Sequence, residues 1–143
     1  MNKRKIQRVS VEGLLLPNKP LTNFELIDAV KELKIPRFRG TFMRNDLPTE
    51  PRSRECGILN LDDVSGRGTH WVCWYKNSKR KYYFDSFGVQ PPEELIRYLT
   101  SPIFYNTERI QPDNQVICGH LCLFVLCRLS RGENYQKVIN FLY

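Results

Sequence analysis

Cys118 is the residue whose place in the sequence points most directly to chemistry. It is followed by Gly119 and an almost uninterrupted apolar run, GHLCLFVLCRL, over residues 119–129. Such a run predicts a helix buried on nearly every face, and the amide dipoles at the start of a helix stabilise a thiolate. Gly119 removes a side chain where a substrate backbone would approach, so we predict a substrate contact there. The pattern therefore indicates a nucleophilic cysteine.

A thiolate that attacks a carbonyl needs a base that exchanges protons with it and a group that orients the base. His70 and Asp85 are the candidates for these two roles. His70 opens HWVCWYK at residues 70–76, and Asp85 lies in KYYFDSF at residues 81–87. Both segments are rich in aromatic and branched residues, which favours strands. The polar residues 77–80 between them predict the turn of a hairpin.

The register of this hairpin decides whether the two groups meet. If the turn is centred on Ser78 and Lys79, Val72 lies opposite Asp85, and His70 is the diagonal neighbour of Asp85 on the same face. The carboxylate can then accept from one imidazole nitrogen and leave the other for the cysteine. A slip of one residue would put the two groups on opposite faces. The predicted site therefore depends on an assumed register.

Gln111 is the candidate donor to the oxyanion that forms on the attacked carbonyl. It lies seven residues before Cys118 in the polar segment QPDNQVIC, which could fold back and bring the side-chain amide beside the thiol. Gln115 is nearer in sequence, and an ordinary loop glutamine is an equally simple interpretation. Spacing alone leaves these alternatives open.

The remaining elements must position these residues. The order Thr22 to Glu25 is that of a capping box, and Phe24, Ile27 and Val30 then recur at helical spacing. We predict helices at residues 23–33 and 93–99 and after Gly132, and a buried strand at residues 56–61. The predicted fold class is α+β, with a small antiparallel sheet packed on a central buried helix.

The bulk properties fit one protein domain. The chain has 143 residues, so we predict a single domain over 1–143, with an amino-terminal arm at 1–20 and a catalytic core at 21–143. The arm is either a docking segment or disordered. No apolar stretch approaches the roughly 20 residues that span a bilayer, and no secretory signal begins the chain. We therefore expect no membrane partner and a monomer that acts inside a cell, where the five cysteines stay reduced.

Residues 21–129 resemble the adenovirus maturation protease (adenain) family, and more closely the adenain-like proteases of Polinton/Maverick elements and related viruses. The resemblance rests on GTHWV at residues 68–72, YFDSFG at residues 83–88 and Q-x6-CGHLC at residues 111–122. It implies the permuted papain-like fold of adenain- and Ulp-type cysteine proteases. It also implies Cys118 as nucleophile, His70 as general base and acid, Asp85 as orienter, and Gln111 with the Cys118 amide as oxyanion hole.

Two departures from the family pattern matter. Asp85 stands where mastadenovirus enzymes carry Glu, although SUMO-specific relatives use Asp at this place. Residues 101–110 hold no cysteine, so the disulfide-linked activating peptide of adenovirus enzymes has no obvious anchor. The resemblance implies a thiol endopeptidase that cleaves capsid or core precursors at small or Gly-containing sites. It also implies DNA or an activating peptide as cofactor, no metal or organic cofactor, and action in a virus factory, nucleus or virion.

Two other functions stay open at this point. The same site could remove ubiquitin or SUMO-like modifiers, because both substrate classes present an extended Gly-rich tail. Alternatively, the net charge of +7 could indicate a DNA-binding packaging protein with an inert triad. The basic residues are spread along the chain, however, and no recognised nucleic-acid-binding motif accompanies them.

Several conspicuous residues have simpler interpretations. Trp71 either walls the substrate channel or packs the sheet. His120 is predicted to point away from the nucleophile, as a core or surface residue. Cys56, Cys73, Cys122 and Cys127 are predicted to be small core residues. A metal site is not expected, because cysteines along one helix cannot converge tetrahedrally.

Overall fold

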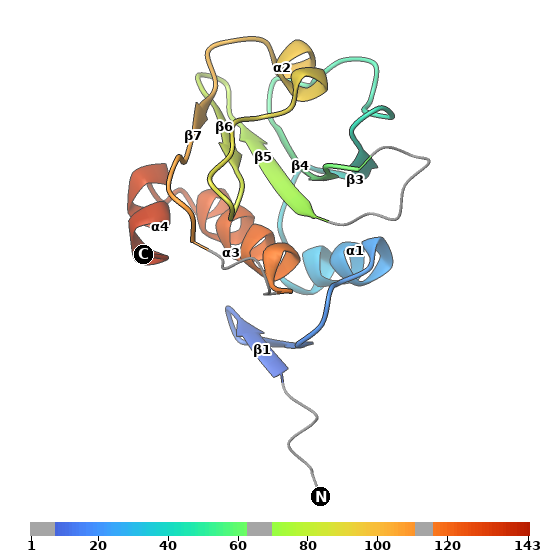
Figure 1. Cartoon of the computed structure of the whole chain (residues 1–143), viewed down its shortest axis with the longest axis vertical. Coiled ribbons are helices and arrows are strands. Elements are labelled where there is room, and N and C mark those ends of the chain that lie inside the picture. The colour runs from blue at the N-terminus through green and yellow to red at the C-terminus, as the bar shows by residue number, and fades with distance from the viewer. Residues whose placement is uncertain (1–7, 63–69, 111–115) are drawn as a thin grey trace, which may run out of the picture.

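A computed structural model describes residues 8–62, 70–110 and 116–143. Figure 1 shows a central sheet with α2 on one side and α1 and α3 on the other. In chain order the elements are β1 (Arg8–Val11), β2 (Leu14–Pro17), α1 (Asn23–Glu32), β3 (Phe38–Met43), β4 (Glu55–Asn60), β5 (Trp71–Lys76), β6 (Lys81–Phe84), α2 (Glu93–Leu99), β7 (Phe104–Tyr105), α3 (Cys118–Ser130) and α4 (Tyr135–Phe141). No helix in these ranges is long and apolar enough to cross a membrane.

The main sheet of the described residues has five strands in the order β3-β4-β5-β6-β7. Its three central strands are antiparallel, as the sequence predicts. The outer strands β3 and β7 pair in parallel with β4 and β6, so the complete sheet is mixed rather than antiparallel. The sequence analysis missed both outer strands. Every residue of β3 is half-buried and β7 has two residues, so neither shows a clear periodicity.

Both faces of the sheet are buried. On one face, Ile58, Cys73 and Phe84 belong to the same core as α3. On the other face, Val72 and Trp74 pack with Leu95 and Leu99 of α2, among other residues. Strands covered on both sides need apolar residues at consecutive positions. This double burial explains why CGILN and WVCW read as continuous apolar runs.

The predicted helices are present with small shifts in their ends. At the start of α1, Thr22 and Glu25 make the predicted capping box. The central buried helix α3 begins at Cys118 and ends at Ser130, and its residues are apolar on several faces because the sheet, α1, α4 and the β1–β2 hairpin surround it. The fold thus places the N-terminus of α3, with its cysteine, against the sheet.

Residues 8–17 of the amino-terminal arm form the β1–β2 hairpin, which docks on α3. Val11 and Leu16 are part of the core around α3. Glu12 accepts hydrogen bonds from Arg128 at 3.0 Å and Arg131 at 2.7 Å, both at the C-terminal end of α3. This part of the arm is therefore packed on the rest of the domain.

A buried carboxylate ties the sheet to α2. Glu55 on β4 is 1% exposed, and its two oxygens accept from Arg39, Trp74 and Tyr98 at 2.7, 2.9 and 2.6 Å. Burial alone would raise the pKa of Glu55, but these bonds and one from the Arg52 amide outweigh it and lower the pKa. The carboxylate is therefore ionised and fully partnered, as buried charges must be.

Gly57 on β4 should be far less tolerant of a side chain than Gly119 on α3. A Cβ at Gly57 would collide with the fully buried indole of Trp74, whereas at Gly119 the nearest atom is a flexible methyl of Leu26 at 3.2 Å. We expect Gly57→Ala to reduce the free energy of unfolding by about 2 to 3 kcal/mol. Gly119→Ala should change it by less than about 1 kcal/mol, because better helix propensity offsets the tighter contact.

Urea unfolding followed by circular dichroism measures both variants. Equal losses of stability at the two glycines would contradict this account of the sheet.

Candidate active site

His70 and Asp85 meet at one end of the β5–β6 ladder. His70 directly precedes β5, and Asp85 directly follows β6. The ladder pairs Cys73 with Phe84, which is the predicted register. The imidazole Nε2 and the carboxylate Oδ1 lie 2.7 Å apart, and both side chains are buried. The hairpin therefore brings the predicted base and acid into direct contact.

Asp85 is held by its neighbours along the chain and by one distant side chain. The Phe87 amide donates to the same Oδ1 atom at 2.8 Å. Asn106 clamps the Asp85 backbone, since its Oδ1 accepts from the Asp85 amide at 3.1 Å and its Nδ2 donates to the Asp85 carbonyl at 2.7 Å. Gly88 has φ of 73° and lies close to the Glu108 backbone, which leaves no space for a Cβ. The carboxylate is thus fixed in orientation.

Cys118 lies at the first residue of α3, where helix amides are free to stabilise negative charge. Its sulfur accepts from the Trp71 amide at 3.4 Å, and it interacts with the His70 side chain. Because Nε2 of His70 bonds to Asp85, the second ring nitrogen is the one left for the sulfur. Two consecutive residues at the start of β5 thus contact the thiol, His70 through its side chain and Trp71 through its backbone amide.

The charge state of His70 follows from these contacts. Burial disfavours the imidazolium, but the hydrogen bonds to Asp85 and Cys118 outweigh burial and raise the pKa of His70 from 6.5 to about 9. At neutral pH the ring is therefore protonated and can donate to the carboxylate and to the sulfur. A cationic imidazole beside a thiol at a helix N-terminus is the arrangement that cysteine nucleophiles use.

Phe87 is a site residue that the sequence analysis did not single out. Its ring stacks on the His70 imidazole with centroids 4.0 Å apart and planes 3° apart, and the Arg109 guanidinium covers its ring at 4.4 Å from the centroid. An aromatic face stabilises a cationic imidazole and fixes its plane. Phe87 belongs to the YFDSFG motif, so the sequence contained a signal that could have identified it as a site residue. Asn106 lies in a stretch without periodicity, so no signal pointed to it.

Trp71 packs in the core and also lines a groove. Its Nε1 donates to the Leu21 carbonyl at 2.9 Å, and its ring is 8% exposed. A groove of about 470 Å³ runs between Trp71, the residues just before α1, and β3. The two interpretations of Trp71 that the sequence left open are therefore compatible. Gly119 faces Leu26 and Leu21, so its small size lets α3 approach the start of α1 closely.

Of the remaining residues that the sequence analysis singled out, those that the structure describes lie outside the contact of His70, Asp85 and Cys118. Gln111 lies in residues 111–115, outside the described residues, so its role stays a prediction. His120 is a core residue, 2% exposed, with Nε2 at 2.8 Å from the Pro17 carbonyl. The cysteines are free and buried, and Cys56, Cys73, Cys122 and Cys127 pack in the core, as predicted. Within the described ranges, no three His, Cys, Asp or Glu side chains form a metal site.

The chain is similar in sequence to two curated adenovirus proteases. It is 30% identical over 141 aligned positions to the Protease of porcine adenovirus A serotype 3, which covers 83% of this chain and 69% of that protein. It is 29% identical over 122 positions to the Protease of bovine adenovirus 2, covering 71% of this chain and 60% of that protein. No family model matches the chain.

Solved proteases share the fold. The crystal structure of the ASFV pS273R protease superposes with a TM-score of 0.60 at 20% identity, over 85% of this chain and 62% of that one. The SUMO protease Ulp1 superposes with a TM-score of 0.52 at 14% identity, over 86% and 74%. These similarities confirm the predicted papain-like fold of the adenain and Ulp type.

Asp85→Asn should lower the pKa of His70. Asparagine keeps an acceptor oxygen for Phe87 but removes the negative charge, so the pKa should fall from about 9 toward 6.5. In the wild type, the raised pKa means that the His70–Asp85 interaction stabilises the fold fully below about pH 6.5. This contribution is lost as the pH rises through about 9.

Titration of the imidazole C–H resonances by NMR measures this pKa. The second histidine, His120, is an internal control, because burial lowers its pKa and it should titrate below 6.5 in both proteins. Titration of His70 at the same pH in wild type and variant would refute the role given to Asp85.

Proposed function

Because the chain belongs to the adenovirus protease family, we propose that it is a cysteine endopeptidase that cleaves viral or virus-like structural precursor proteins at small or Gly-containing sites. The observation that carries the proposal is the buried contact of His70 with both Asp85 and Cys118. A histidine that only packed in the core would need one hydrogen-bond partner. A histidine poised between a carboxylate and a thiol at a helix N-terminus has the arrangement that nucleophilic catalysis requires.

In the proposed reaction, the Cys118 thiolate attacks the carbonyl carbon of the scissile peptide, and a C–S bond forms. The carbonyl oxygen becomes an oxyanion, which the Cys118 backbone amide and Gln111 are proposed to stabilise. The His70 imidazolium gives its proton to the leaving amine as the C–N bond breaks. His70 then takes a proton from water, which hydrolyses the thioester and restores the thiolate. Asp85 orients His70 and stabilises its cationic form throughout.

Substrate binding is proposed along the groove beside Trp71. The groove reaches the residue that follows His70 and is bounded on the other side by Thr41, Phe42 and Met43 of β3, so an extended peptide could pass close to the site. A wall made of bulky side chains favours residues without large side chains at the scissile bond. The substrate-contact role of Gly119 and the maturation of virion precursors are part of the same proposal.

The first test is covalent labelling. We expect an electrophilic peptide with a Gly-containing recognition sequence to form an adduct at Cys118, located by mass spectrometry. Cys118→Ala should abolish the adduct, and His70→Ala should slow labelling by at least about 100-fold, because the imidazolium no longer supports the thiolate. Cys127→Ala, which removes a buried thiol away from the site, is the matched control. Absence of any adduct would favour an inert basic scaffold protein.

A second candidate function is the removal of ubiquitin-like modifiers, which the shared fold with a SUMO protease favours. We expect a Gly-containing precursor peptide to be cleaved with a higher kcat/KM than ubiquitin or SUMO reporters. Cleavage of the modifier reporters alone would contradict the maturation proposal.

Duplex DNA is proposed as a cofactor because of the net charge of +7, and its effect is measured in the same cleavage assay. Any stimulation by DNA must fall steeply with salt concentration, because it depends on phosphate contacts.

A further inference from the structure

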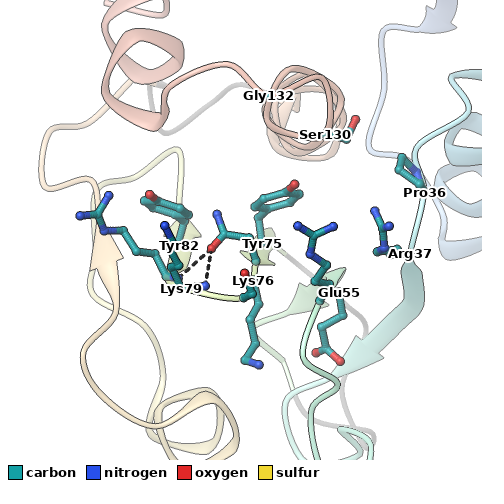
Figure 2. Close-up of a pocket in the computed structure, with 13 residues that line it drawn as sticks. Pro36, Arg37, Glu55, Tyr75, Lys76, Lys79, Tyr82, Ser130 and Gly132 are labelled. Atoms are coloured by element: carbon teal, nitrogen blue, oxygen red, sulfur yellow. Dashed lines mark hydrogen bonds between the residues drawn. The ribbon is translucent and has the colours of Figure 1, made fainter.

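A second cavity lies at the opposite end of the hairpin from His70. It has a volume of about 420 Å³ and is bounded by the β5–β6 turn, the segments that lead into β3 and β4, and the end of α3. Figure 2 shows Tyr75 and Tyr82 beneath Ser130 and Gly132, with Pro36 and Arg37 on the far wall. The cavity has the size of a small-molecule site. None of its lining residues belongs to the proposed active site.

The lining is strongly cationic. Five of its residues are basic: Arg37, Arg54, Lys76, Lys79 and Arg80. Of the described lining residues only Glu55 is acidic, but its carboxylate points away from the cavity in Figure 2 and is held by Arg39, Trp74 and Tyr98. The C-terminal dipole of α3 contributes only about half a negative charge. Lys76 contributes less than the others, because its ammonium donates to the Arg52 and Ser53 carbonyls and points away from the cavity in Figure 2. Among the described lining residues, the cavity therefore carries a net positive charge.

Lys79 and Arg80, two of the five basic residues, belong to a rigid turn. The Asn77 side-chain oxygen accepts from the backbone amides of Lys79 and Arg80, each at 2.8 Å, as the dashed lines in Figure 2 show. Lys76 donates to the carbonyls of Arg52 and Ser53, which ties the end of β5 to the segment before β4. Tyr82 stacks on Tyr135 at 4.8 Å, so the floor is also fixed. A preformed site loses little entropy when a ligand binds.

We propose that this cavity binds a small molecule with several phosphoryl groups, such as an inositol polyphosphate or inorganic polyphosphate. The cationic groups of Arg37, Arg54 and Lys79, which come from three segments, match phosphoryl oxygens in charge and in hydrogen-bond capacity. A concave site of this volume suits a compact polyanion better than the backbone of a duplex, which needs an extended basic surface. The proposal does not depend on protease activity.

The position of the cavity suggests what the ligand would do. The cavity lies where β5 and α3 end, and the opposite ends of these two elements carry the residues of the proposed active site. A bound polyanion would bridge the hairpin turn and the end of α3, and it would leave Cys118 accessible. Binding should therefore raise the thermal stability of the protein without blocking labelling of the thiol.

Isothermal titration with inositol hexakisphosphate and with tripolyphosphate tests the proposal. The pocket variant is Arg54→Gln/Lys79→Gln/Arg80→Gln, and the matched control, Lys31→Gln/Lys34→Gln/Lys137→Gln, removes the same charge from exposed positions elsewhere. We expect Kd to rise at least about tenfold in the pocket variant and to change less than about threefold in the control. A gain in Tm on ligand addition should be lost only in the pocket variant.

A single substitution provides a separate test in case the triple variant does not fold. Ser78 is exposed on the turn, so Ser78→Glu should leave the fold intact and weaken binding through charge repulsion. Equal weakening in the pocket and control variants would show that only diffuse charge attracts the ligand and would overturn the proposal. No binding of either polyphosphate to the wild type would overturn it as well.

Duplex DNA is the alternative occupant that the same experiment separates. If a short duplex binds through these residues while neither small polyphosphate does, the surface is a nucleic-acid interface and the proposal is wrong. Cys118→Ala should bind inositol hexakisphosphate with the wild-type Kd. Failure of the labelling test at Cys118 would therefore leave the result at this cavity unaffected.

Discussion

The register of the β5–β6 ladder is the constraint on which the site depends. His70 comes just before β5 and Asp85 just after β6, at the same open end of the hairpin, so a shift of one residue would move one of them to the other face. Burial on both faces prevents such a shift, because Val72 and Trp74 fit one core while Cys73 and Phe84 fit the other. The 2.7 Å contact between imidazole and carboxylate is thus a consequence of packing along the whole hairpin.

Packing of α3 against β5 adds the third member of the site. The helix begins at Cys118, where its amides are unpaired, and the Trp71 amide reaches the sulfur from the strand. The proposed nucleophile is therefore surrounded by backbone dipoles and by a protonated histidine. Gly119 permits this close approach because it has no side chain where Leu26, Trp71 and Leu21 lie. Core packing and chemistry use the same residues here.

Buried charge is distributed so that each group has partners. Glu55 is neutralised by Arg39 and three further donors on the α2 side of the sheet, and Asp85 is paired with His70 at the strand ends. An unpaired buried charge costs several kcal/mol, so these partners are required by the fold and not only by function. The cationic cavity at the far end of the hairpin differs, because among the described residues no acid forms an ion pair with its five basic side chains.

Much of this protein could be inferred from sequence because its signals are local. The capping box at Thr22, the aromatic hairpin segments and the apolar run after Cys118 each predict one element through short-range propensity and periodicity. The order of His70, Asp85 and Cys118 indicated the chemistry. Local signals could not reveal the parallel edge strands, since β3 lacks alternation and β7 is too short.

Only the tertiary structure decided which distant groups meet. Asn106 clamps Asp85 across 21 residues, Phe87 stacks on His70, and Glu55 is buried among partners from three segments. The five basic residues of the second cavity are spread from Arg37 to Arg80, and they appeared in the sequence as diffuse charge. A propensity belongs to a residue and its neighbours along the chain. A contact between distant residues depends on how the whole chain packs, which no local pattern encodes.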